Sequence, residues 1–191
     1  MVLKEKIQQD LNTALKKKEE LKSSVFRLLL AAILNKEKEK RYKLSKDYYP
    51  PTALPPERAP KPELKEEELI KKSQLTDEEV IEVISSETKK RKESILEFEK
   101  GRLQPTLHPA RKKHIMDLVD KEKKELEILQ KYLPEQLPEE EIKKLAKEAI
   151  EKVGAKEPKD MGKVMAELMP KVKGRADGSL VNKIVKELLG S

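Results

Sequence analysis

The chain has no cysteine and no tryptophan, only two histidines, and just four tyrosines and two phenylalanines. The lack of cysteine excludes disulfide frameworks, cysteine-ligated zinc, iron–sulfur clusters and thiol nucleophiles. His108 and His114 are six positions apart and would not share a helix face, so a histidine-rich metal site is not expected. So few aromatic rings also argue against a protein that binds single-stranded nucleic acid by stacking its bases.

Long apolar runs are missing as well. The longest, Leu28–Leu34, has seven residues, too few to cross a bilayer. The N-terminus carries charge from Lys4 onward and lacks the apolar stretch of a signal peptide. We therefore expect a cytoplasmic protein with no membrane partner.

Charge is what the sequence has in abundance. Of its 191 residues 41% are charged and 36% hydrophobic, and 43 basic against 36 acidic residues give a formal net charge of +7. Many lysines, glutamates, leucines and alanines are typical of helices with solvated faces. The excess of positive charge favours a polyanionic partner, but weakly, because acids and bases alternate along the chain.

Apolar residues recur at helical spacing through most of the chain and no segment alternates as a strand does, which predicts an all-α protein. Residues 1–43 form either a helix hairpin or one kinked helix. Thr76 and Glu79 form a capping box that opens a helix ending near Gly101. Further helices are expected at about 111–132, 139–153 (followed by Gly154), 160–169 (ended by Pro170), and from about 179 to the C-terminus.

Prolines suggest how the chain is divided. A Pro-rich insertion is expected at about 44–75, with an extended loop from Tyr48 to Pro62, because proline lacks an amide donor and disfavours helical geometry before it. A break is expected at Pro134–Pro138. This division gives an N-terminal helical domain, 1–133, and a smaller C-terminal three-helix domain, 134–191.

Enzyme signatures are missing: there is no P-loop and no GxGxxG motif. Acidic residues mostly stand three or four positions from a lysine, as on solvated helix faces. We expect no catalytic residue, no metal and no cofactor in this chain by itself.

Three basic clusters remain as candidate sites. Lys89–Lys92 and Arg111–Lys113 lie within predicted helices, and each is either a solvated, ion-paired helix face or a contact for a polyanion. The third cluster, Lys171, Lys173 and Arg175, surrounds a turn that contains Gly174 and precedes a helix N-terminus. Basic side chains with free backbone amides suit an RNA phosphate, while a plain helix–helix turn would use glycine as well.

Several sequence blocks resemble a known family. Met161–Met165, Pro170–Gly178 and Val181–Lys183 resemble the end of YqeY-like proteins, and the same blocks are similar to the tail domain of the B subunit of tRNA-dependent amidotransferase. Upstream, the segments 86–94 and 132–137 also resemble the YqeY pattern. The Pro-rich stretch departs from it.

The resemblance implies an all-helical fold with a small three-helix tail. It also implies a link to glutamine-dependent amidation of misacylated tRNA, so a label of carbon–nitrogen ligase with glutamine as amido-N donor would come from the larger enzyme. It supplies no catalytic residue and favours an RNA-facing surface at the turn. The RNA-binding residues we expect are Lys163, Lys171, Lys173, Gly174, Arg175 and Lys183, together with Lys89 and Arg91.

Three functions stay open. The chain is a module that binds tRNA or another structured RNA by shape and phosphate, a protein-interaction adaptor without RNA binding or catalysis, or a component of an amidotransferase-like assembly.

Overall fold

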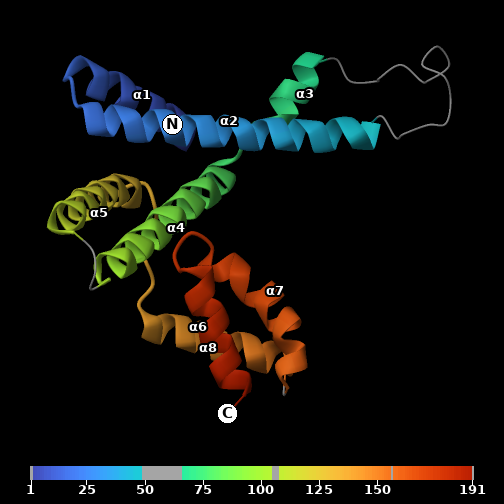
Figure 1. The fold of residues 1–191 in the computed structure, drawn as a ribbon. Helices are drawn as coiled ribbons and strands as arrows, with labels where there is room; N and C mark the ends of the chain where they lie inside the picture. The colour runs from blue at the N-terminus through green and yellow to red at the C-terminus, as the bar shows by residue number, and fades with distance from the viewer. Residues whose placement is uncertain (1, 49–65, 105–107, 156, 191) are drawn as a thin grey trace, which may run out of the picture. The chain divides into compact units, whose positions relative to one another are not determined.

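The computed structural model describes residues 2–48, 66–104, 108–155 and 157–190, and over these ranges it contains helices and no strand. The all-α prediction is confirmed. The helices are α1 (Leu3–Lys16), α2 (Glu20–Tyr48), α3 (Glu66–Ser73), α4 (Asp77–Arg102), α5 (Pro109–Gln130), α6 (Glu139–Val153), α7 (Met161–Val172) and α8 (Gly178–Leu189), with a 3₁₀ turn at Pro158–Asp160 (Figure 1). Within these ranges no helix is long and apolar enough to span a bilayer.

The contacts within the chain group it into two compact units, Met1–Val83 and Ile84–Ser191, and the boundary falls inside α4. A division at residue 134 therefore stays a prediction. Each unit is described by itself below.

In the first unit α1 and α2 lie side by side as a helix hairpin (Figure 1). Ile7, Leu11 and Ala14 form the buried stripe of α1, and α2 buries Val25 and Leu29 among others. Lys18 takes the left-handed conformation, with φ of 56°, and the amide of the following residue donates back to α1. Of the two predicted forms, the hairpin is the one that occurs.

The expected insertion contains regular structure at both of its ends. Helix α2 continues to Tyr48, and α3 occupies Glu66–Ser73, where no helix was expected. Three glutamates begin α3 and two lysines end it, which complements the helix dipole, and Leu69 is buried. The predicted extended loop at 48–62 lies almost wholly outside the described residues.

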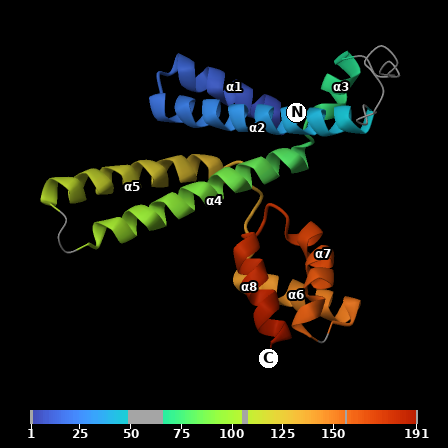
Figure 2. The same cartoon turned by 45° about the vertical axis from the view of Figure 1, so that its right-hand side comes forward.

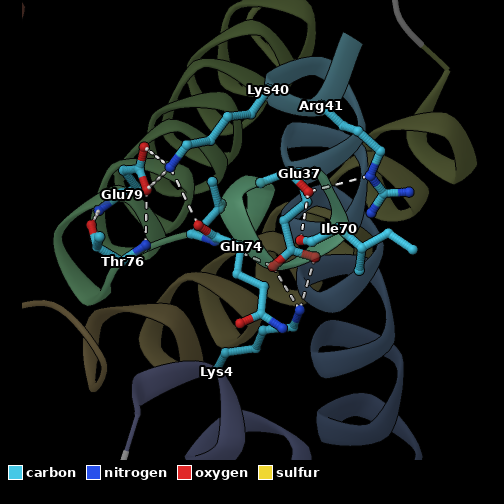
Figure 3. A network of polar contacts seen from close by, with 10 residues as sticks. Lys4, Glu37, Lys40, Arg41, Ile70, Gln74, Thr76 and Glu79 are labelled. Carbon is cyan, nitrogen blue, oxygen red and sulfur yellow. Dashed lines mark hydrogen bonds and ion pairs between the residues drawn. The ribbon is translucent and has the colours of Figure 1, made fainter. Parts of the chain in front are cut away.

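A polar network holds the start of α4 and the end of α3 against α2 (Figure 3). The buried carboxylate of Glu37 accepts two hydrogen bonds from Lys4 Nζ, at 2.7 and 2.8 Å, and one from the Leu75 amide at 3.4 Å. Lys40 Nζ contacts both oxygens of Glu79 at 2.8 Å. Glu37 and Lys40 of α2 thus hold the segment from Leu75 to Glu79, which lies more than thirty residues further along the chain.

The predicted capping box is present at the start of α4. The Thr76 amide donates to Glu79 Oε2 at 2.8 Å, and the Glu79 amide donates to Thr76 Oγ1 at 3.3 Å. These reciprocal bonds satisfy two amides that a helix start leaves without partners, and α4 begins where the sequence predicts.

In the second unit α4 and α5 run side by side in opposite directions (Figure 2). Helices α6, α7 and α8 pack on one another around a core of their own. The buried side chains of this core include Leu137, Ile142, Ala146, Val164, Leu168, Val172, Val181 and Val185. The second unit thus combines a helix hairpin with a three-helix cluster.

The expected end of α7 at Pro170 is wrong, because the helix runs through the proline to Val172. Proline removes one backbone hydrogen bond, to the carbonyl of Ala166, which is an exposed residue. Val172 is 1% exposed and lies one turn after the fully buried Leu168. Burial of this last apolar turn outweighs the missing bond.

Candidate nucleic-acid interface

The turn between α7 and α8 closes both helix ends with its own groups. Gly174 has a φ of +71°, the left-handed region that glycine adopts without strain. The amides of Arg175 and Ala176 donate to the Val172 carbonyl at 3.0 Å, and the Asp177 carboxylate accepts from the Ser179 amide at 2.8 Å. Asp177 is thus the N-cap of α8.

The same turn is hydrogen-bonded to the segment that precedes α6. The Leu137 amide donates to the Arg175 carbonyl at 2.7 Å, and Gln136 Nε2 donates to the Gly174 carbonyl at 3.0 Å. Arg175 Nε donates to the carbonyl of Glu135 at 3.3 Å. Two sequence blocks that each resembled the family pattern are therefore neighbours in space, which their separation in the sequence could not show.

These bonds bear on the phosphate-site hypothesis, which relied on free backbone amides at the turn. The amides of Arg175, Ala176 and Ser179 already have acceptors, and a carboxylate occupies the start of α8. These three amides are therefore not available to an anion at this turn.

The predicted lysines on α7 and α8 have acidic neighbours. Lys163 Nζ lies 2.9 Å from Asp160 Oδ1, and Lys183 Nζ lies 3.9 Å from Glu187 Oε1. Lys171 Nζ lies 3.5 Å from Glu167, which also pairs with Lys152. The hydrogen bond from Lys152, followed by the charges of both lysines, lowers the pKa of the Glu167 carboxyl. Each of these predicted cations thus shares its surface with a carboxylate.

Around the turn itself, the side chain of Lys173 is exposed and that of Arg175 is half-buried. Lys171, at the end of α7, is also exposed. These three residues, with Gly174 between them, form what we call the turn cluster: Lys171, Lys173, Gly174 and Arg175.

The two candidates on α4 differ from each other. Lys89 is exposed and lies 3.9 Å from Glu93. Arg91 is 8% exposed, and its guanidinium lies 2.9 Å from Glu125 and 3.3 Å from Glu87. The charge of Arg91 is thus turned into the α4–α5 interface and paired there, which does not favour an RNA contact through Arg91, and that contact stays a prediction.

Comparison with known families assigns the chain. A family model described as Yqey-like protein matches residues 4–49 and 58–189. The chain belongs to the YqeY-like family. The match leaves residues 50–57 unaligned in the middle of this YqeY-like chain, a shorter stretch than the insertion expected at 44–75. No curated protein matches the chain.

Sequence reasoning missed two features of this YqeY-like protein. The segment 135–137 was not identified as the partner of the turn, although both belonged to the resemblance. Arg111–Lys113 was noted as basic but was left out of the predicted site.

Among the described residues, no group of three His, Asp or Glu side chains converges as metal ligands would.

Proposed function

We propose that this YqeY-like protein is a small cytoplasmic module that binds structured RNA, in the first place tRNA, through phosphate contacts of the turn cluster. The observation that carries the proposal is the rigid anchoring of the turn by its three hydrogen bonds to residues 135–137. Cations on a preorganised turn lose little freedom when they bind, so more of their interaction appears as affinity.

Charge and composition support the same function. The net charge of +7 favours a polyanion, and the scarcity of aromatic residues favours recognition by shape and phosphate over base stacking. The resemblance of residues 161–183 to the tail domain of the amidotransferase B subunit supports tRNA as the ligand. We propose that the protein acts without catalysis of its own, free or within an amidotransferase-like assembly.

The experiment replaces Lys171 and Lys173 together by glutamine and measures tRNA binding by fluorescence anisotropy at several salt concentrations. Arg175 is kept, because its hydrogen bond to Glu135 is structural. The matched control replaces Lys144 and Lys147 of α6, two exposed lysines without an ion-pair partner among the described residues.

Each lost phosphate contact should lower the slope of log affinity against log salt by roughly 0.7 to 0.9. Folded tRNAs of different sequence should lose about the same affinity, because phosphate contacts do not read bases. Equal losses in the control pair would mean that only net charge matters, and the turn would have no role as a dedicated contact.

A protein-interaction adaptor is the second candidate, favoured by apolar side chains exposed on α2. Leu28 is 54% and Leu34 45% exposed. An adaptor should lose its co-purifying protein when both are changed to glutamate, while its tRNA binding, if any, is unchanged. Retention of that protein by the variant would count against this candidate.

A further inference from the structure

The free end of the α4–α5 hairpin carries positive charge without acidic neighbours. No acidic residue occurs between Glu99 and Asp117. The same stretch contains five basic residues and two histidines. We call the described part of this stretch, residues 100–104 and 108–116, the hairpin end; its basic residues are Lys100, Arg102, Arg111, Lys112 and Lys113.

The hairpin end gathers in one place because α4 and α5 are antiparallel. Figure 2 shows the last turn of α4 and the first turn of α5 at the same end of the hairpin. Lys123 of α5 lies 3.3 Å from Glu99 of α4, so the two helices are in contact along the hairpin. Basic residues of two separate helices are therefore carried at the same end of the hairpin (Figure 2).

Most of these cations have no partner within the described part of the chain. Lys100 pairs with Glu97 at 2.9 Å, but no ion pair or side-chain hydrogen bond engages Arg102, Arg111, Lys112 or Lys113. The candidates Lys89, Lys163 and Lys183 each have a carboxylate within 4 Å. Unpaired, exposed charge thus distinguishes the hairpin end from the sites that the sequence suggested.

The basic residues at the start of α5 also lie where a helix favours negative charge. The first turns of α3, α4 and α6 each contain three acidic residues, which complement the positive helix N-terminus. The first turn of α5 contains no acid, and Arg111 lies within it. Basic residues at this position repel one another and the positive end of the helix dipole, which lowers the stability of the free protein. A bound anion would relieve this repulsion.

We propose that the hairpin end is a second phosphate-binding surface, which holds the backbone of double-stranded RNA. This surface is separate from the turn cluster and does not depend on it. Side chains make the contacts, because the amides of Ala110, Arg111 and Lys112 already donate to His108. Arginine and lysine on an exposed helix end reach phosphates without entering a groove.

Duplex backbone is the form of polyanion that this surface suits. The hairpin end has no tyrosine, phenylalanine or tryptophan on which an unpaired base could stack, and its only rings are those of His108 and His114. Its large exposed apolar residues are Leu103 and Met116, too few for insertion into a lipid surface. The ligand that remains is a backbone of repeating phosphates, which the surface would recognise by charge alone.

The test uses the full-length chain and a labelled 20-base-pair RNA duplex. The hairpin variant replaces Arg102, Arg111 and Lys113 by glutamine. The matched control replaces Lys144, Lys147 and Lys186, three exposed lysines of the same unit without an ion-pair partner among the described residues. Both variants lose the same net charge, and their melting temperatures are measured beside binding.

At about 100 mM salt the hairpin variant should bind the duplex at least about tenfold more weakly, and its salt slope should fall by roughly two to three. The control should lose less than about threefold. The melting temperature of the hairpin variant should change little, because Arg111 opposes the dipole of α5 while Arg102 favours that of α4. An unchanged melting temperature excludes unfolding as the cause of weaker binding.

Unchanged duplex binding in the hairpin variant overturns the proposal, as does an equal loss in the control. A variant that loses binding to vesicles with anionic lipid, yet binds the duplex as before, would assign the surface to membranes and also overturn it. The Lys171/Lys173 variant is measured in parallel. Because it changes only the turn cluster, its result decides the proposed function separately from the hairpin end.

Discussion

The amide of Leu137 donates a 2.7 Å hydrogen bond to the carbonyl of Arg175, so the segment that precedes α6 is joined to the turn between α7 and α8. The Leu137 side chain is 7% exposed and belongs to the core of α6, α7 and α8. From Leu137 onward the link after α5 is thus part of the C-terminal helices. The conformation of the turn and that of the link depend on each other.

Replacing Gly174 by valine should destabilise the protein by about 1–2 kcal/mol, because a branched residue is strained at a φ of +71°. Chemical denaturation measures the effect. The control Gly162→Ala lies within α7 at a negative φ, and an added Cβ there meets nothing within 4 Å. It should stabilise by about 0.5–1 kcal/mol. A neutral Gly174→Val would mean that the turn does not need its left-handed residue.

Glu37→Gln should cost about 1–3 kcal/mol, because both carboxylate oxygens accept from Lys4 Nζ and a glutamine nitrogen would face that donor in either orientation. The Leu75 amide should also exchange its hydrogen faster. Glu39→Gln is the matched control on the same helix: Glu39 is exposed and pairs with Lys36 at 3.2 Å, so it should change stability by less than about 0.5 kcal/mol. Equal effects would remove the special role of Glu37.

Arg91→Met should destabilise the protein by about 3–5 kcal/mol, because it leaves the buried carboxylate of Glu125 without a counter-charge, whereas Glu87 keeps its ion pair with Lys90. The double variant Arg91→Met/Glu125→Leu should recover much of this loss, since an apolar pair needs no counter-charge. Lys89→Ala, two residues before Arg91 and exposed, should change the free energy of unfolding by less than about 0.5 kcal/mol. If the double variant is as unstable as the single one, the ion pair is not the cause.

The contributions of Glu122 and Glu79 to the free energy of unfolding should depend on pH in opposite directions. Burial, and next the charge of Glu125, raise the pKa of the Glu122 carboxyl. Its contribution to stability is therefore full below the unfolded pKa of about 4.3 and is lost as the pH rises through the folded pKa. Glu122→Gln should be more stable than the parent near pH 7.5, and the difference should shrink toward pH 4.

For Glu79 the sign is reversed. The hydrogen bond from Lys40, and next the one from the Thr76 backbone, lower the pKa of the Glu79 carboxyl. Its stabilisation is present above the unfolded pKa and is lost as the pH falls through the folded pKa. Glu79→Gln should therefore be less stable near pH 7.5, with a smaller penalty toward pH 4. Unfolding free energies of both variants across this range test the pair, and equal signs would contradict both assignments.

Local signals in the sequence predicted several elements closely. The capping box at Thr76 and Glu79 marked the start of α4, and the bounds 139–153 of α6 agree with its apolar spacing and with Gly154, which has a φ of 65°. Family membership could also be read from the blocks at 161–183 and 132–137. These features depend on residues a few positions apart, because capping bonds and helix periodicity are satisfied within one or two turns.

Partners distant in the sequence were decided only by the tertiary structure. Nothing near Arg91 shows that Glu125, on another helix, will bury its charge, and nothing near Pro170 shows that a core will hold Val172 and carry α7 past the proline. Likewise the cations of α4 and α5 are brought to the same end of a hairpin only because the two helices fold back on each other (Figure 2). The sequence by itself therefore determined most of the helices through local signals. Burial and pairing depend on which helices meet, so only the tertiary structure decided where α7 ends and which charges have no partner among the described residues.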